Sequence, residues 1–165
     1  TDEAAYMNVI ERKTAVLFAA ATRLAAHIAG ASGPLQDSMA AYGMHLGLAF
    51  QIADDVLDYT GDADALGKNL GDDLHEGKAT LPLIHAMAHA DDTLKQRLCA
   101  IIEQGDGSAM PDVLAAIEAA GSLQYSIDKA HQHAQAAKAA LAVVPDGAWK
   151  QALLELADYS VARNH

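Results

Sequence analysis

Three aspartates near the middle of the chain have the residue type and spacing best suited to chemistry. Asp54, Asp55 and Asp58 end an apolar run with D-D-x-x-D spacing. If this run is helical, Asp54 and Asp58 share one face and Asp55 lies beside it. Carboxylates this close repel one another, and at the C-terminal end of a helix they also oppose the macrodipole. A hard cation such as Mg²⁺, which takes oxygen ligands, would relieve both effects. The spacing therefore predicts a Mg²⁺ site rather than a solvated acidic helix end.

Lysines on both sides of the aspartates are candidate ligands for an anion. Lys13 precedes Thr14 in an apolar stretch, and Lys68 and Lys78 each follow a glycine. From the first aspartate to Glu76 there are eight acidic residues and one lysine. A lysine in an apolar helix ordinarily extends to water, and one in a glycine-rich loop is ordinarily a surface residue. Next to a metal site, the same lysines could instead hold diphosphate oxygens as point charges.

Other kinds of site find less support in the sequence. Gly67-Lys68 lacks the G-x-x-x-x-G-K-[ST] spacing of a nucleoside triphosphate loop, and no strand precedes it. His85 and His89 are four residues apart, but Ala86 stands where an H-E-x-x-H zinc motif has its glutamate. We interpret these histidines as ordinary helix residues. No G-x-S-x-G motif supports a serine hydrolase.

Composition narrows the class of protein. The chain has 165 residues, enough for one compact domain, and is 52% hydrophobic but only 5% aromatic. A net charge of −11 argues against a nucleic-acid partner. Cys99 is the single cysteine, which excludes an internal disulfide and fits a cytoplasmic protein. The most apolar stretch, residues 14–31, contains Arg23 and His27, so we expect a buried helix rather than a transmembrane segment.

The elements that must position these residues are all expected to be helices. Alanine is abundant, apolar residues recur with a helical period, and no segment alternates with the period of a strand. The aspartates fall at the end of the second expected helix, and a polar loop is expected over residues 62–79. The predicted helices cover residues 3–29, 33–59, 80–89, 91–105, 111–121, 122–144 and 146–162.

Taken together, these motifs resemble the second aspartate-rich region of trans-isoprenyl (polyprenyl) diphosphate synthases. Lys13-Thr14-Ala15 is similar to the K-T motif of the family, and residues 6–18, 67–87 and 121–125 are most similar to bacterial octaprenyl diphosphate synthases. Ala79 departs from the family, which often has proline there. The runs that carry the resemblance are Phe50-Gln51-x-x-Asp54-Asp55-x-x-Asp58, Gly67-Lys68-x-x-Gly71-x-Asp73 and Glu76-Gly77-Lys78-x-Thr80-Leu81-Pro82-Leu83.

The resemblance implies an all-α fold, an antiparallel helix bundle of the isoprenoid synthase type. Residues 1–165 would be the C-terminal portion of a single synthase domain, because the family's first D-D-x-x-D motif has no counterpart here. The implied reaction is the Mg²⁺-dependent condensation of isopentenyl diphosphate with an allylic diphosphate such as farnesyl diphosphate, giving octaprenyl diphosphate for quinone side chains. A homodimer is also implied.

Residue roles follow from the same resemblance. The metal would be held by Asp54 and Asp58 with support from Asp55, and the diphosphate by Lys13, Lys68 and Lys78. Thr14 and Gln51 would place oxygens near the carbocation, so the expected catalytic residues are Lys13, Thr14, Gln51 and Asp54. Two other classes stay open: a terpene cyclase of the same fold, and a non-catalytic helical partner subunit. We expect the 165 residues alone to be inactive, because the other metal half-site is missing.

Overall fold

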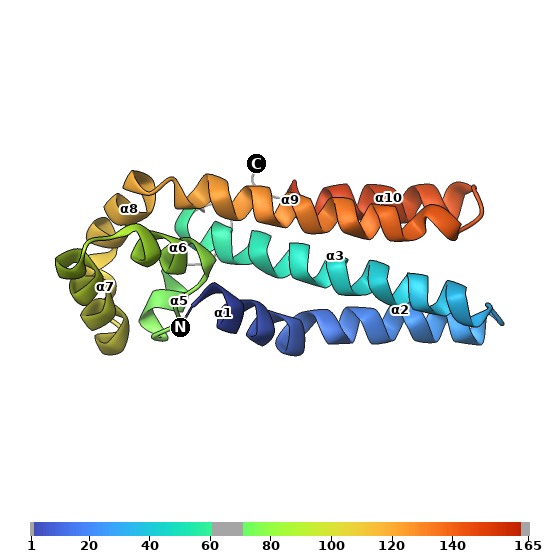
Figure 1. Ribbon diagram of the computed structural model, residues 1–165, viewed down its shortest axis with the longest axis horizontal. Coiled ribbons are helices and arrows are strands. Elements are labelled where there is room, and N and C mark those ends of the chain that lie inside the picture. Colours follow the sequence, from blue (N-terminus) through green and yellow to red (C-terminus); the bar gives the residue numbers. More distant parts are fainter. Residues whose placement is uncertain (1, 61–70, 163–165) are drawn as a thin grey trace. The chain divides into compact units, whose positions relative to one another are not determined.

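The computed structural model describes residues 2–60 and 71–162, and every regular element in these ranges is helical (Figure 1). This confirms the predicted all-α class. The elements are α1 (Glu3–Ile10), the π-helix η1 (Glu11–Ala15), α2 (Val16–Ile28), α3 (Gly33–Thr60), α5 (Asp72–His75), α6 (Leu81–His89), α7 (Asp92–Gln104), the 3₁₀ turn η2 (Gly107–Ala109), α8 (Met110–Ala119), α9 (Ser122–Ala140), the 3₁₀ turn η3 (Leu141–Val143) and α10 (Ala148–Val161).

Two of the differences from the sequence-based prediction affect segments that carry predicted site residues. The expected first helix is interrupted by η1, whose five residues include Lys13 and Thr14. The expected polar loop contains α5. Leu74 of this short helix is completely buried in a hydrophobic core, and its burial holds the segment in an ordered conformation. Within the described residues, no helix has the combination of length and apolar character that crossing a membrane requires.

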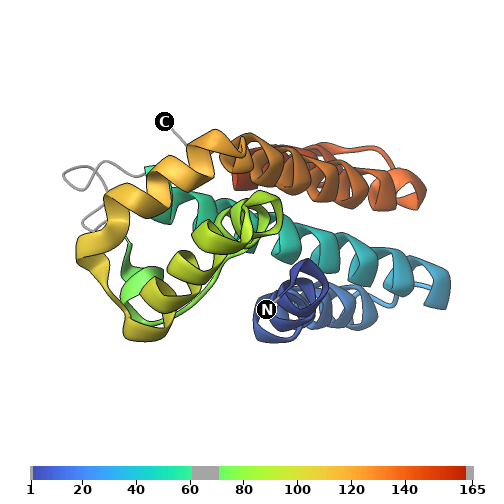
Figure 2. The ribbon, with the colours of Figure 1, turned by 60° about the vertical axis from the view of Figure 1, so that its left-hand side comes forward.

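The chain forms two compact units. The described residues of the first are 2–6, 54–60 and 71–127, and α6 packs there against both α7 and α8 (Figure 2). The second contains residues 7–53 and 128–162. Helix α3 belongs to both, since the boundary falls between Ala53 and Asp54. The buried core of the first unit consists of Tyr59, Leu74, Leu83, Ala86, Leu98, Ile101, Val113, Ala116 and Ile117, and that of the second of Tyr42, Leu46, Ala137, Leu141 and Ala157.

Two glycines let α3 approach the first helices of the second unit closely. A Cβ atom built on Gly43 would lie 2.5 Å from the carbonyl oxygen of Phe18, and one built on Gly47 would lie 2.6 Å from the Cα atom of Ala15. Any larger residue would therefore push the two backbones apart. Because Ala15 closes η1, this contact fixes the π-helical segment against α3 and places Thr14 beside it.

Candidate functional site

The structure divides the three aspartates into two kinds. All three lie near the C-terminal end of α3, as predicted. Asp54 and Asp58 are partly exposed, whereas Asp55 is only 5% exposed. Asp54 and Asp58, one helical turn apart, are thus the carboxylates that a ligand from solvent could reach. Asp55 faces the interior of the protein.

Asp55 is fixed by a residue that the sequence did not single out. The Tyr6 hydroxyl, from α1, donates a 2.7 Å hydrogen bond to Asp55 Oδ2, and Tyr6 is 4% exposed. Burial, followed by the charge and hydrogen bond of Asp55, raises the pKa of Tyr6 far above its ordinary value, so the phenol remains a donor. Tyr6 therefore ties α1 to the aspartate motif. No local sequence pattern predicts this contact, because Tyr6 and Asp55 are 49 positions apart.

Asp58 lies next to a second residue that the sequence did not assign to the site. The Asp73 amide donates to Asp58 Oδ2 at 3.3 Å, and the Gly71 amide donates to the Asp58 carbonyl oxygen at 3.1 Å. Burial and the nearby Asp73 charge raise the pKa of Asp58 to about 6, although hydrogen bonds from the Asp72 and Asp73 amides partly oppose this. Burial and the Asp73 charge therefore both disfavour the ionised form of Asp58, which a bound cation would favour.

Lys78 is brought to the same acidic segment. Its Nζ atom contacts Glu76 and lies 3.6 Å from Asp73 Oδ1. The hydrogen bond to Glu76 is the main cause that raises the pKa of Lys78. Lys78 and Glu76 are about half exposed or more, so their ion pair is weak and an incoming anion can replace it at little cost, whereas Asp73 is 25% exposed. Lys68, the other lysine predicted for this segment, lies outside the described residues.

The residues around Asp54 and Asp58 fit a metal that is shared with a ligand. In residues 2–60 and 71–162, no group of three or more histidine, cysteine, aspartate or glutamate side chains is arranged to hold a metal ion. Mg²⁺ is commonly bound through one or two carboxylates, with waters and substrate phosphates completing its shell. Two partly exposed carboxylates one helical turn apart, with the Asp73 charge near Asp58, match that mode of binding.

The predicted catalytic residues other than Asp54 belong to the second unit, where two of them meet. The Thr14 hydroxyl, in η1, donates a 2.8 Å hydrogen bond to Gln51 Oε1 on α3, and Gln51 is 7% exposed. Lys13, also in η1, is exposed. The Val16 amide reaches back to the Glu11 carbonyl, which is the wide turn of a π-helix. Such single-turn bulges occur frequently at functional sites.

The histidines make structural contacts of the kind expected for ordinary helix residues. His85 Nδ1 lies 2.9 Å from the hydroxyl of the buried Ser122, and the His85 ring stacks on Tyr125 with ring centres 4.0 Å apart. The His89 Nδ1–H donates to the His85 carbonyl at 2.8 Å. One further pair, His45 and His133, joins α3 to α9 with 3.1 Å between the two Nδ1 atoms.

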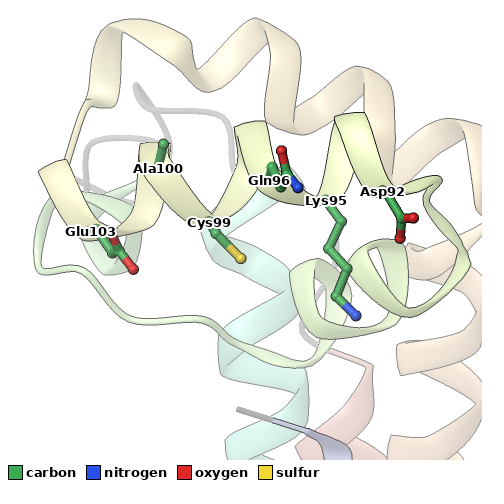
Figure 3. Close-up of a pocket in the computed structure, with 6 residues that line it drawn as sticks. All are labelled: Asp92, Lys95, Gln96, Cys99, Ala100 and Glu103. Carbon is green, nitrogen blue, oxygen red and sulfur yellow. The ribbon is translucent and has the colours of Figure 1, made fainter.

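A hollow on α7 surrounds the single cysteine (Figure 3). Lys95, Cys99 and Glu103 follow one another at intervals of four residues along this helix. All of the lining residues come from α7, and none of the predicted site residues is among them. Mixed charges on a single helix face do not converge on one ligand, so this hollow is not part of the candidate site. Its lining residues are Asp92, Lys95, Gln96, Cys99, Ala100 and Glu103.

The fold is all-helical, with accessible aspartates on one helix and with a lysine and a threonine on a π-helical turn. Comparison with known proteins identifies the class of protein that has these features. The family model described as polyprenyl synthetase matches residues 1–120. Octaprenyl diphosphate synthase of Escherichia coli (strain K12) is 46% identical over 160 residues, which are 96% of this chain and 50% of that protein.

Solved structures agree with the sequence comparison. A decaprenyl diphosphate synthase from Rhodobacter capsulatus superposes with a TM-score of 0.92 at 40% identity, over 100% of this chain and 51% of that one. A polyprenyl synthase from Caulobacter crescentus CB15, complexed with calcium and isoprenyl diphosphate, also gives 0.92, at 42% identity over 99% of this chain and 51% of that one. The chain belongs to the polyprenyl synthetase family, and it spans about half the length of these relatives.

Proposed function

We propose that this chain is the C-terminal portion of a trans-polyprenyl diphosphate synthase, which joins isopentenyl diphosphate to an allylic diphosphate. The observation that carries the proposal is the pair of accessible carboxylates on α3, Asp54 and Asp58, beside the buried Asp55. A pair of carboxylates on one helix face is suited to a divalent cation that a diphosphate shares. Family membership supports this use of the site, as does the complex of the Caulobacter polyprenyl synthase with calcium and isoprenyl diphosphate.

In this proposal the side chains of the first unit bind the metal ion and the diphosphate. Asp54 and Asp58 are the metal ligands, and Tyr6 keeps Asp55 turned inward behind them. Mg²⁺, when bound, supplies neutralisation of the charge that develops on the leaving diphosphate. Lys78 exchanges its partners Glu76 and Asp73 for diphosphate oxygens, and Lys68 is assigned the same role from the sequence.

The second unit supplies the remaining roles. Lys13 is exposed on η1 and is assigned to the diphosphate. The hydrogen bond between Thr14 and Gln51 fixes both side chains, and we assign their oxygens to the stabilisation of the allylic cation. The apolar helix faces exclude water from that cation. We infer octaprenyl diphosphate as the product from the 46% identity to the Escherichia coli enzyme. A cytoplasmic homodimer is part of the same proposal.

Replacing Asp54 tests the metal role. In a full-length synthase that contains this chain, Asp54→Ala should lower kcat by orders of magnitude, because a metal ligand is removed while the helix is kept. Steady-state incorporation of isopentenyl diphosphate at saturating Mg²⁺ measures the effect, and circular dichroism checks the helix content. Asp37→Ala is the matched control, because Asp37 is on the same helix but exposed and paired with Arg23. Near-normal turnover of the Asp54 variant would remove Asp54 from the mechanism.

The same assay separates the proposed reaction from the two alternatives. A terpene cyclase would convert the allylic diphosphate without isopentenyl diphosphate, whereas a synthase gives no elongated product unless isopentenyl diphosphate is present. A non-catalytic helical subunit would show no Mg²⁺-dependent binding of inorganic pyrophosphate in calorimetry. Elongation that depends on isopentenyl diphosphate, together with such binding, is the result we expect.

A further inference from the structure

The hydroxyl of Thr80 does not make the hydrogen bond that its position suggests. Thr80 is the N-cap residue of α6, where a threonine side chain ordinarily accepts a hydrogen bond from a backbone amide of the first turn. Here the side chain makes no capping bond, and its hydroxyl donates to the Tyr59 hydroxyl at 3.0 Å. Thr80 and Tyr59 are only 6% and 4% exposed. The hydroxyl therefore joins α6 to α3 through a buried hydrogen bond.

This hydrogen bond joins two residues that stand next to proposed site residues. Tyr59 directly follows the proposed metal ligand Asp58, and Thr80 comes two residues after Lys78. The beginning of the same segment is also tied to α3, because the Gly71 amide donates to the Asp58 carbonyl oxygen at 3.1 Å. Lys78 thus lies in a stretch of chain that is held to the end of α3 on both sides.

The backbone of Lys78 is also fixed on the side of α5. The Lys78 amide donates to the Asp73 carbonyl oxygen at 2.8 Å, and the Gly77 amide donates to that of Leu74 at 3.0 Å. With Gly77 at a φ of 69°, these two hydrogen bonds form the Schellman arrangement that ends a helix. A single residue separates Lys78 from Thr80, so the Thr80 hydrogen bond fixes the chain on the other side of the lysine.

The side chain of Lys78, in contrast to its backbone, can change partners. It is 49% exposed, and its Nζ atom lies 3.6 Å from Asp73 Oδ1. The charge of a lysine is carried on a flexible stem, so the place of its backbone decides which ligands it can reach. A diphosphate near Asp58 must be met by the lysine in one geometry. The position of the Lys78 backbone relative to Asp58 therefore decides how well Lys78 can bind such a diphosphate.

We propose that Thr80 is a positioning residue of the synthase. Through its hydrogen bond to Tyr59, it holds Lys78 at the distance from Asp58 at which both can serve one diphosphate. This inference rests on the proposed function, because it assigns a role within that site. Thr80 acts through Lys78 and does not touch the substrate. The competing explanation is that the hydrogen bond only stabilises the fold, in which case its loss would lower stability without a specific effect on diphosphate binding.

Binding of inorganic pyrophosphate in the presence of Mg²⁺ separates the two explanations. The measurement is calorimetry on a full-length synthase that contains this chain. Lys78→Met should raise the dissociation constant about tenfold or more, because a hydrogen bond to a charged group is lost. Thr80→Val keeps the shape of the side chain but removes the hydroxyl, and it should raise the constant about threefold or more. Added to Lys78→Met, Thr80→Val should change the constant by less than about twofold, because Thr80 acts only through the lysine.

Urea unfolding of the same proteins measures the structural part of the effect. Thr80→Val should lower the free energy of unfolding equally with and without Lys78→Met. Thr80→Ser keeps the hydroxyl and should bind pyrophosphate within about twofold of the wild type. Tyr59→Phe removes the acceptor and should weaken binding as Thr80→Val does, so it tests the proposal even where Thr80→Val does not fold. Ser126→Ala is the matched control, because the buried Ser126 hydroxyl of the same unit donates to the Ser122 carbonyl of its own helix. It should lower stability and leave binding unchanged.

The outcomes distinguish the positioning role from the proposed function. Weaker binding in Lys78→Met, with unchanged binding in Thr80→Val and Tyr59→Phe, would overturn the positioning role and leave the proposed function standing. An effect of Thr80→Val that is equally large with and without Lys78→Met would also overturn it, because the effect would not pass through the lysine. A wild-type protein that binds no pyrophosphate, or Lys78→Met that binds it as the wild type does, would count against the proposed function, and the positioning role would be wrong as well.

Discussion

At the scale of single residues, the hydrogen bond between Tyr6 and Asp55 makes the sharpest prediction. Tyr6→Phe keeps the ring but removes the donor from a carboxylate that is 5% exposed. A hydrogen bond to a charged group contributes about 1.5–3 kcal/mol, so we expect urea unfolding to show a loss of that size. Tyr159→Phe, at a 66% exposed tyrosine, is the control and should change stability little.

The effect should depend on Asp55. Combined with Asp55→Asn, Tyr6→Phe should cost less than it does alone, because the charge that strengthens the hydrogen bond is gone. If Tyr6→Phe unfolds within about 0.5 kcal/mol of the wild type, the hydrogen bond does not hold the aspartate motif. In the full-length enzyme the same variant should raise the Mg²⁺ concentration needed for half-maximal turnover, because Asp54 and Asp58 would then be less firmly positioned.

The histidine pair of the second unit predicts sensitivity to acid. Burial, then His45 and Lys129, lowers the pKa of His133 to about 4, and burial lowers the pKa of His45. An unfolded histidine titrates near pH 6.5, so as the pH falls the unfolded chain takes up protons first. The pair therefore contributes stability that is complete above about pH 6.5 and is lost towards pH 4. Solvent screening of the partly exposed rings reduces the expected loss to about 1–2 kcal/mol.

Urea unfolding at pH 7.5 and at pH 5 measures this loss. His133→Gln should unfold with a smaller difference between the two pH values than the wild type does. His131→Gln is the control, because His131 is exposed on the same helix and its replacement leaves the pair intact. An equal pH dependence in the wild type and in His133→Gln would show that the pair does not titrate with folding.

Residue types and spacing predicted only part of the candidate site. Asp54 and Asp58 could be placed on one face because four residues make about one helical turn. Asp73 stands in one of the runs that carry the resemblance, but neither it nor Tyr6 was given a role at the site, since their contacts with Asp58 and Asp55 are tertiary. Thr80 shows the same limit of local patterns. It occupies the N-cap position of α6, as its place in the sequence suggests. Its hydroxyl, however, donates to the Tyr59 hydroxyl at 3.0 Å, which is a tertiary contact.

At the scale of helices, the close approach of α3 to η1 can be tested at Gly47. Gly47→Ala would place a Cβ atom 2.6 Å from the Ala15 backbone, so α3 must move away. Overpacking of this kind costs roughly 1–3 kcal/mol, which urea unfolding should detect. The same movement should weaken the hydrogen bond between Thr14 and Gln51 and lower kcat in the full-length enzyme.

Gly33 provides the matched control for this substitution. It is the first residue of the same helix, and a Cβ atom there would have no neighbour within 4 Å. Gly33→Ala should therefore be neutral or slightly stabilising, because alanine lowers the entropy of the unfolded chain. If Gly47→Ala and Gly33→Ala change the free energy of unfolding equally, the contact at Gly47 is not tight.

Helix positions were more predictable than helix geometry. Asp91 caps α7 by accepting from the Leu94 amide at 2.8 Å, and Gly105 ends that helix with a φ of 59°, as the sequence signals indicate. The π-helical turn was not predictable, because Glu11 to Ala15 are ordinary helix formers. The extra residue in this turn is accommodated by packing against Gly47, which is a tertiary cause.

At the scale of the whole molecule, we predict that the 165-residue chain alone does not elongate an allylic diphosphate. It spans about half the length of its relatives, and within residues 2–60 and 71–162 no group of three or more metal-ligating side chains is arranged to hold an ion. Labelled isopentenyl diphosphate with farnesyl diphosphate and Mg²⁺ measures elongation, and Escherichia coli octaprenyl diphosphate synthase is the positive control. Elongated product above the protein-free background would show that this half suffices.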